Sequence, residues 1–302
     1  MATSALLGWL LFSASASAAC TRDFLVGATD KYVAAQAAGS SDDIASLAAP
    51  NVTYTENEIP KSISDGVLSE AIKIDHNRSI HDTVNCATFT ELIAASNPHQ
   101  YVIGTRILFN NDSKISLIES IVTDTGDWAF NATGYLYWNS QEKWDPIPED
   151  KRDTREVIQA AGDAYFNRFK NENVTVPFGV PCSRLEGGAS TAPLNMTGDS
   201  CTLAGLPSTL VVTNRRYVVD EVMGVVDIYL GFPGLDRSQG DKPMPDSHMF
   251  RVESGEIRYI HTVSSCVEAG CGFNGTFPPP PPSSRFRRLR AFEKPRLSMR
   301  GY

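Results

Sequence analysis

Two histidines in the carboxy-terminal third of the chain stand in surroundings that suit acid–base chemistry. His248 and His261 each alternate with apolar residues. Successive side chains of a strand point to opposite faces, so both imidazoles are predicted to point into an apolar cavity. In that setting an imidazole is a candidate proton donor or acceptor. The ordinary alternative is a buried histidine hydrogen-bonded to a carbonyl group. The apolar neighbours are Phe250 and Val252 for the first histidine, and Ile257, Tyr259 and Val263 for the second.

Three further side chains are candidates to complete such a site. Asp220 and Asp246 could each orient an imidazole, although an aspartate after proline ordinarily caps a turn. Tyr217 is a candidate hydrogen-bond donor to a developing oxyanion, with simple packing as the alternative. We therefore predict that His248, His261, Tyr217 and Asp220 are the catalytic residues.

The first half of the chain also carries a dense cluster of acids and imidazoles. A glycosylation sequon at Asn77 lies inside this cluster, which favours a solvated loop over an active site. Glu119 stands where the second half has His261, so any two cavities should differ. We predict that the second half carries the chemistry and that the first is mainly structural. The cluster consists of Asp75, His76, His81 and Asp82.

Several common cofactor and catalytic motifs are missing from the sequence. It has no G-x-G-x-x-G, no Walker loop, no G-x-S-x-G and no H-E-x-x-H. It also has no C-x-x-C pair, and its histidines and cysteines lack zinc-site spacing. We therefore expect cofactor-free chemistry without a metal.

The elements that must position these residues occur twice. Three segments of the first half match three of the second in the same order, with a separation that grows from 133 to 142 residues, as loop insertions would produce. This duplication predicts two similar domains, residues 19–150 and 151–276. The matched segments are 22–32 with 155–165, 77–82 with 215–220, and 114–122 with 256–263.

Each domain is predicted to begin with one helix and to continue as strands. Apolar residues recur at helical spacing over 152–169, with Asp153 or Thr154 as the cap, and 21–36 is the equivalent helix. Alternating segments follow in both halves, so the predicted class is α+β. The predicted strands are 101–109, 113–123, 211–220, 248–252 and 256–263.

Several features predict passage through a secretory pathway. Residues 1–18 join a short apolar block to an A-x-A ending, the pattern of a cleaved signal peptide, and no later apolar run is long enough to span a membrane. Glycosylation acceptors follow throughout the chain. They are Asn51, Asn77, Asn111, Asn131, Asn173, Asn195 and Asn274.

The six cysteines are predicted to form three disulfides, as is usual in an oxidising compartment. Sequence alone leaves every pairing open. We favour Cys182 with Cys201 and Cys266 with Cys271 as short loops, which leaves Cys20 to bond with Cys86.

The charge is unevenly distributed. The net charge is −8, yet residues 283–302 hold seven basic side chains and one acidic side chain. An acidic body argues against nucleic acid as a partner. We predict that 277–302, a proline run followed by the basic stretch, is a disordered tail that activity does not need.

The chain resembles a known fold and, more narrowly, a secreted fungal family. A closing strand of the form G-x-I-x-x-I, at 255–260, together with one initial helix and a curved antiparallel sheet, resembles the NTF2-like (SnoaL-like) α+β cone, here in two tandem copies. In such folds the helix and the sheet enclose an apolar cavity. Segments similar to the fungal family are 74–79 (IDHNRS), 181–188 (PCSRLEGG), 216–221 (RYVVDE) and 245–248 (PDSH).

That resemblance implies a reaction. The family includes the hetero-Diels–Alderases of tropolone sesquiterpenoid biosynthesis, which dehydrate a polyketide-derived hydroxymethyl tropolone and add the resulting quinone methide to a terpene alkene. A small apolar substrate of this type is therefore the expected partner. The alternatives are another SnoaL-like cyclase or isomerase, and a secreted glycoprotein that binds a lipophilic ligand without turnover. NTF2-like units often form homodimers, so the duplication is expected to imitate that dimer, and a homodimer of the whole chain is a further expectation.

Overall fold

The computed structural model describes residues 20–192, 201–203, 207–233, 243–267 and 271. These residues form four α-helices and two six-stranded mixed sheets, which confirms the α+β class. The predicted signal peptide 1–18, the tail 277–302 and the sequons at Asn195 and Asn274 lie outside the described residues. No helix within the described ranges has both the length and the apolar character needed to cross a membrane.

The first sheet has the strand order β2-β1-β6-β5-β4-β3, and β1 pairs in parallel with β6 while the other neighbours are antiparallel. Two helices and two 3₁₀ turns accompany it. The elements are α1 (Arg22–Ala38), α2 (Ser41–Leu47), β1 (Ala48–Glu56), β2 (Ile59–Pro60), η1 (Ile63–Asp65), η2 (Val67–Ser69), β3 (His76–Asp82), β4 (Ala87–Ala94), β5 (Tyr101–Phe109) and β6 (Ile115–Thr123).

The second sheet repeats that topology in the order β8-β7-β12-β11-β10-β9, again with one parallel pair, β7 with β12. The prediction of an antiparallel sheet is therefore wrong for one strand pair in each half. The shared strand order agrees with the duplication inferred from the sequence. Its elements, with those that link the two halves, are α3 (Ala132–Asn139), η3 (Glu149–Lys151), α4 (Arg155–Arg168), β7 (Phe178–Glu186), β8 (Ala189–Ser190), β9 (Thr213–Asp220), β10 (Val225–Phe232), β11 (Met244–Glu253) and β12 (Glu256–Ser264).

The two long helices begin at equivalent caps. The hydroxyl of Thr21 accepts the backbone N–H of Phe24, and that of Thr154 accepts the N–H of Val157, so both helices satisfy a donor that would otherwise lack a partner. Helix α1 ends at Gly39, whose φ of 64° lies in the left-handed region that favours glycine. A Cβ there would lie 2.5 Å from the backbone nitrogen of Ala71, so no larger residue fits.

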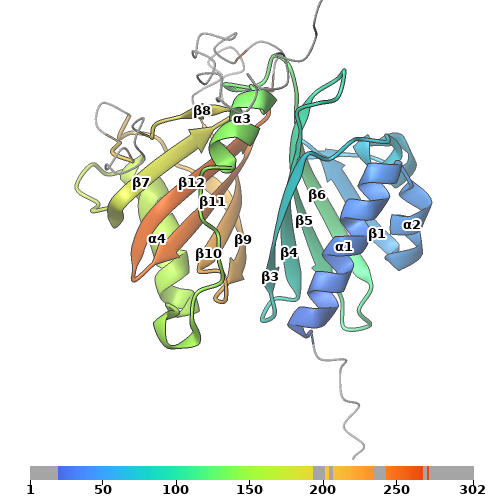
Figure 1. Cartoon of the computed structure of the whole chain (residues 1–302), viewed down its shortest axis with the longest axis horizontal. Helices are drawn as coiled ribbons and strands as arrows, with labels where there is room; N and C mark the ends of the chain where they lie inside the picture. Colours follow the sequence, from blue (N-terminus) through green and yellow to red (C-terminus); the bar gives the residue numbers. More distant parts are fainter. Residues whose placement is uncertain (1–19, 193–200, 204–206, 234–242, 268–270, 272–302) are drawn as a thin grey trace, which may run out of the picture.

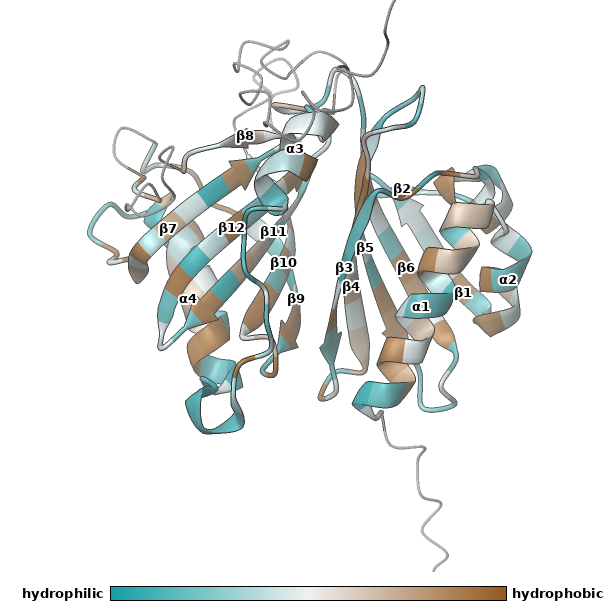
Figure 2. Cartoon of the chain, viewed as in Figure 1, coloured by the Kyte–Doolittle hydropathy of each residue, from teal (hydrophilic) through white to brown (hydrophobic). Residues whose placement is uncertain are grey.

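The molecule is layered as helix, sheet, sheet and helix (Figure 1). Helix α1 packs on one face of the first sheet and α4 on one face of the second, and each encloses a hydrophobic core. The opposite faces of the two sheets pack against each other through two further apolar clusters. Apolar residues recur along the strands of both sheets (Figure 2). Helix α3 lies across one end of this interface (Figure 1).

Two ion pairs cross the interface in a swapped, pseudo-twofold arrangement. Arg22 at the start of α1 makes two hydrogen bonds to Asp220 at the end of β9, of 2.7 and 2.9 Å. Arg155 at the start of α4 makes two to Asp82 at the end of β3, of 2.8 and 2.6 Å. Arg22 matches Arg155 in the repeat, and Asp82 matches Asp220. Each arginine thus binds the aspartate of the other half. The interface has the isologous form of a twofold dimer.

This arrangement corrects the prediction that the acid–imidazole cluster of the first half is a solvated loop. His81 and Asp82 are buried in strand β3 at the domain interface, and only the sequon residue Asn77 is exposed. The backbone N–H of His81 donates to Asp220, and its Nε2 lies 3.1 Å from the hydroxyl of Thr29. The glycan argument failed because alternate residues of one strand face solvent and protein in turn.

The three disulfides are those favoured from the sequence: Cys20–Cys86, Cys182–Cys201 and Cys266–Cys271. Among the described sequons, four asparagines are exposed, which is where a glycan can be accommodated. The fifth, Asn131, is half-buried and accepts the N–H of Gly134 as the cap of α3. The exposed acceptors are Asn51, Asn77, Asn111 and Asn173.

Candidate functional site

A small cavity of about 80 Å³ lies between helix α4 and the second sheet. Its walls are mainly aromatic and aliphatic, and a few polar groups from β7, β11 and β12 reach it. This combination of apolar walls with convergent polar groups is typical of small-molecule sites. The lining residues are Trp128, Tyr165, Phe169, Arg184, Glu186, Pro207, Leu210, Phe232, Asp246, His248, Thr262 and Ser264.

His248 and Asp246 form a hydrogen-bonded pair on strand β11 within this lining. Nδ1 of His248 lies 2.5 Å from Oδ1 of Asp246, and the hydroxyl of Ser264 donates to the other carboxylate oxygen. A carboxylate accepts, so Nδ1 carries the hydrogen. Nε2 makes no hydrogen bond to any described residue and is therefore the nitrogen available to a ligand. His248 lines the second-half cavity, as expected from strand parity, and Asp246 lines it beside His248.

A cationic group lies on the same lining. Arg184 donates to Glu186 at 2.7 Å and to the hydroxyl of Tyr165 at 3.4 Å, while its buried Nε has no partner. Burial lowers the pKa of Arg184, but the neighbouring oxygens of Tyr165 and Glu186 outweigh it and raise the pKa above its usual value. The hydroxyl of Thr262, which lies opposite His248 in the strand pairing, is also buried without a partner. Two residues of this lining thus hold a buried polar atom that no described residue satisfies.

The first half has a different arrangement at the matching positions. Thr105 lies opposite Ser120 in β5 and β6, as His248 lies opposite Thr262 in β11 and β12. The hydroxyl of Tyr32 donates to Thr105 at 2.7 Å, and Thr105 lies 2.9 Å from Ser120. A closed chain of hydroxyl groups therefore occupies the place where the second half holds an imidazole.

His261 does not face this cavity, which corrects the prediction that both histidines share it. It lies on the opposite face of the sheet, at the domain interface, beside Trp144 and Tyr135. A β-bulge near Arg258 shifts the pairing of β12 with β11, so that Ile257 faces helix α4 while Val263 faces the first domain. Strict alternation fails across a bulge because one extra residue reverses the facing of those that follow.

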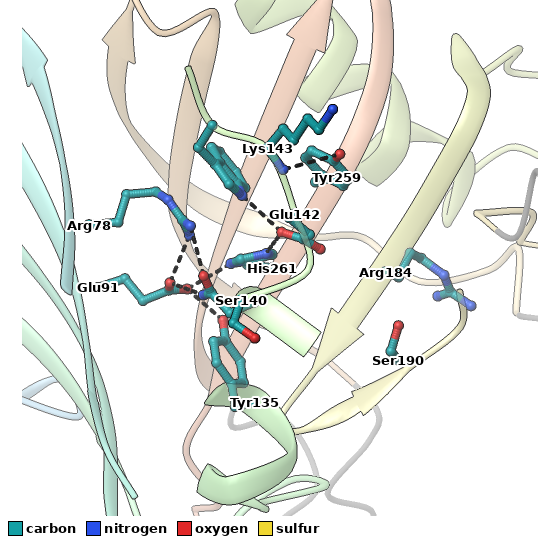
Figure 3. Close-up of polar contacts among 12 residues, drawn as sticks. Arg78, Glu91, Tyr135, Ser140, Glu142, Lys143, Arg184, Ser190, Tyr259 and His261 are labelled. Atoms are coloured by element: carbon teal, nitrogen blue, oxygen red, sulfur yellow. Dashed lines mark hydrogen bonds and ion pairs between the residues drawn. The ribbon is translucent and has the colours of Figure 1, made fainter. Parts of the chain in front are cut away.

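A buried polar network surrounds His261 (Figure 3). Its Nδ1 lies 2.8 Å from Glu91 of the first domain, and its Nε2 lies 2.6 Å from Glu142 of the segment that follows α3. Glu91 also accepts from Tyr135 at 2.7 Å and from Arg78 at 3.1 Å. Each hydrogen-bonding group of this imidazole is thus used within the protein.

The charges in this network stabilise one another. Burial alone would lower the pKa of His261, but the carboxylates of Glu142 and Glu91 outweigh it and raise the pKa to about 9. Burial raises the pKa of Glu91, yet His261 and Arg78 hold it well below its usual range. A protonated His261 therefore joins the two domains as a buried cation between two anions.

Tyr217 and Asp220 also lie away from the cavity. Tyr217 donates to Asp163 of helix α4 at 2.9 Å, and burial together with this carboxylate raises the pKa of the phenol to about 12. Asp220 is the interface partner of Arg22. Burial would raise its pKa, but hydrogen bonds from His81 and Arg22 lower it to about 2. The four predicted catalytic residues are therefore not brought together.

Sequence reasoning identified His248 and Asp246 but missed the other polar residues of the cavity, among them Arg184 and Thr262. Arg184 lies on β7, which is remote in sequence and pairs in parallel with β12, so no local pattern links it to His248. Thr262 carried a usable signal, because it is the residue of β12 paired with His248. The sequence analysis instead chose its neighbour, His261, as a catalytic residue.

Comparison with known proteins yields one family. Residues 151–264 match the model of a domain of unknown function, DUF8021, which covers the repeat that contains the cavity. No curated protein matches the chain. The fold and the site thus define a duplicated α+β protein with an imidazole–carboxylate pair in an apolar cavity of its second half.

Proposed function

We propose that the second half is a cofactor-independent acid–base site that removes water from a hydroxylated, apolar substrate. The observation that carries the proposal is the His248–Asp246 pair, whose free Nε2 belongs to an apolar cavity that also contains Arg184. The resemblance to the NTF2-like cone supports it, because a cavity between a helix and a sheet is what that resemblance implies, and this cavity lies between α4 and the second sheet. The three disulfides fit a secreted protein.

The chemistry follows from the available groups. Protonated Nε2 of His248 would donate its hydrogen to the leaving hydroxyl, the carbon–oxygen bond would break, and water would depart. A ring hydroxyl of the substrate would pass its proton to the carboxylate of Glu186, which lines the same cavity, and would become the carbonyl of a quinone methide. Return of that proton to the imidazole of His248 through solvent would restore the starting state. Arg184 would stabilise the negative charge that develops on that oxygen. Asp246 would hold the imidazole in position and stabilise its cationic form.

The finer proposal is the hetero-Diels–Alder addition that the family resemblance implies. Addition of a terpene alkene to the quinone methide needs no nucleophile, only two partners held in reacting geometry with water excluded. The cavity of about 80 Å³ is smaller than the roughly 300–1,000 Å³ of typical ligand sites. We therefore propose that the reacting ring enters the cavity and that the alkene approaches from the side of Pro207 and Leu210.

Product formation from a hydroxymethyl tropolone and a humulene-type alkene tests the proposal. We expect His248→Ala to lower the rate by about 10²–10⁴-fold, the range for loss of a general acid. His99→Ala is the matched control, since His99 is exposed and pairs with Asp124 at the surface. Circular dichroism should show that both variants fold. An unchanged rate and stereochemistry in the folded His248 variant would refute the catalytic proposal. Tight substrate binding by the wild-type protein without turnover would instead favour the binding glycoprotein.

A further inference from the structure

A second and larger cavity lies on the other side of the second domain, away from His248. Its volume is about 530 Å³, within the range of sites for small organic ligands. One wall is the segment between α3 and α4, and the floor comes from β11 and β12. The lining residues are Lys143, Asp145, Pro146, Ile147, Pro148, Lys151, Val180, Pro181, Arg251, Glu253, Ser254, Arg258 and Tyr259.

Hydrogen bonds to backbone groups hold the segment between α3 and α4 in place. None of them involves the side chains of Lys143 or Lys151. The backbone N–H of Ile147 donates to the carbonyl of Val222 at 2.8 Å, and Arg152 donates to the carbonyl of Ile147 at 2.9 Å. Arg251 donates to the carbonyl of Asp145 at 2.8 Å. The cavity is therefore preformed, which reduces the entropic cost of binding.

Positive charge is available on this lining. Arg251 and Arg258 are paired with Glu253 and Glu256. Lys143 and Lys151 are exposed and make no ion pair within the described part of the chain.

Asp145 and Arg258 also contribute to the net charge of this lining. Asp145 is an exposed carboxylate of the same wall, so it offsets one lysine. Nη1 of Arg258 is buried and has no hydrogen-bond partner among the described residues, so it adds positive charge to the wall. The lining thus keeps an excess of cationic donors in a chain whose net charge is −8.

The remaining walls are apolar. Val180 is 66% exposed, and the rings of Pro148, Pro181 and Tyr259 line the cavity beside it. The ring of Tyr259 is 5.5 Å from that of Trp144, which supports it from the interface side. An aromatic face next to a cationic group suits a flat apolar body that carries an anion.

We propose that this cavity binds a small organic anion, with its carboxylate, sulfonate or phosphate at Lys143 and Lys151 and its apolar body against Pro181 and Tyr259. The site is separate from His248 and does not depend on the proposed dehydration. The affinity for the anion should fall as the salt concentration rises, because ion pairs at an exposed site are screened at higher ionic strength.

Titration with 8-anilinonaphthalene-1-sulfonate tests the proposal on the full chain, with N-phenyl-1-naphthylamine as a neutral analogue. We expect the double variant Lys143→Gln/Lys151→Gln to weaken binding of the sulfonate at least tenfold at low salt and to leave the neutral analogue unaffected. The matched control is Lys31→Gln/Lys73→Gln, which removes the same charge from exposed positions elsewhere. His248→Ala reports any binding at the smaller cavity and should leave the lysine effect intact.

Three outcomes would overturn the proposal. They are failure of the wild-type protein to bind the sulfonate, equal weakening in the control variant, and affinity that is insensitive to removal of Lys143 and Lys151.

Discussion

The swapped ion pairs predict that Asp220 stabilises the contact between the domains in a pH-dependent manner. The carboxylate is buried and accepts two hydrogen bonds from Arg22 and one from the backbone of His81. Its pKa falls from 3.8 to about 2, which corresponds to about 2 kcal/mol of native-state stabilisation at neutral pH. Asp220→Asn keeps the shape but removes the charge, so it should lower the free energy of unfolding by about that amount.

The direction of the pH dependence follows from the lowered pKa. A carboxylate whose pKa is lower in the folded state contributes its full stabilisation above about pH 4, and the contribution disappears as the pH falls through about 2. The variant and the wild type should therefore differ by about 2 kcal/mol at pH 7 and converge between about pH 4 and pH 2.

Urea denaturation at a series of pH values measures this difference, provided that the m-value is unchanged. Asp112→Asn is the matched control, because Asp112 is exposed and its carboxylate makes no ion pair within the described residues. A double-mutant cycle with Arg22→Gln isolates the pair itself. A difference between wild type and Asp220→Asn that is the same at pH 7 and pH 2.5 would refute the reasoning, as would an equal loss in the Asp112 control.

Two further predictions concern a buried cation and a pair of glycines. His261→Gln leaves two buried carboxylates without their shared cation and should lower the free energy of unfolding by about 3–5 kcal/mol. The pKa of His261 is raised to about 9, so its stabilisation is complete below about pH 6.5 and is lost as the pH rises through 9; urea titrations should show this loss in the wild type and not in the variant. Gly39→Ala should cost about 1–3 kcal/mol, because φ is positive and the new Cβ meets the backbone of the neighbouring segment. Gly27→Ala, in the same helix with open space around it, should stabilise by about 0.5–1 kcal/mol in thermal unfolding, and equal effects of the two substitutions would contradict the steric argument.

Local sequence signals were sufficient for the two long helices and for the strands β5, β6, β9, β11 and β12, but they did not mark α2, α3, β3, β4, β7 or β10. The favoured disulfide pairing was confirmed, although the sequence had left every pairing open. Helical spacing marked both long helices, and each starts within three residues of its predicted position. The duplication predicted that the two halves are alike, and the matched segments do occupy matched elements: α1 with α4, β3 with β9, and β6 with β12. These features were predictable because each signal either lies within a short stretch of sequence or is an internal repeat of the chain.

The site was less predictable because its members meet only through tertiary pairing. Strand parity placed His248 beside Phe250, but the predicted strand began at His248, so Asp246 remained only a candidate partner until β11 was seen to begin at Met244. The prediction put His261 on the wrong face of the sheet. A bulge near Arg258, which no residue pattern indicates, reverses the face to which the following residues of β12 point. Arg184 depends on a parallel strand pairing, and Glu91 reaches His261 across 170 residues of chain. Such contacts require the whole fold.

Duplication within one chain allows the two ends of the domain interface to carry different residues, which a symmetric homodimer does not. In a dimer of identical units, both ends of the twofold interface would carry the same residues. Here one end joins Glu91 to His261, while the matching end joins Glu119 to Arg216 at 3.2 Å, with the guanidinium 5.1 Å from the ring of Tyr229.

The interiors between helix and sheet differ between the two halves in the same way. In the first half the hydroxyl groups of Tyr32 and Thr105 occupy the matching place, and in the second half an imidazole lies there whose Nε2 has no partner among the described residues. A copy that need not hold a ligand can fill its interior and contribute stability through the shared interface. The other copy can then keep unsatisfied donors such as Arg184 and Thr262 in its cavity, at a cost of about 1–3 kcal/mol for each buried group without a partner.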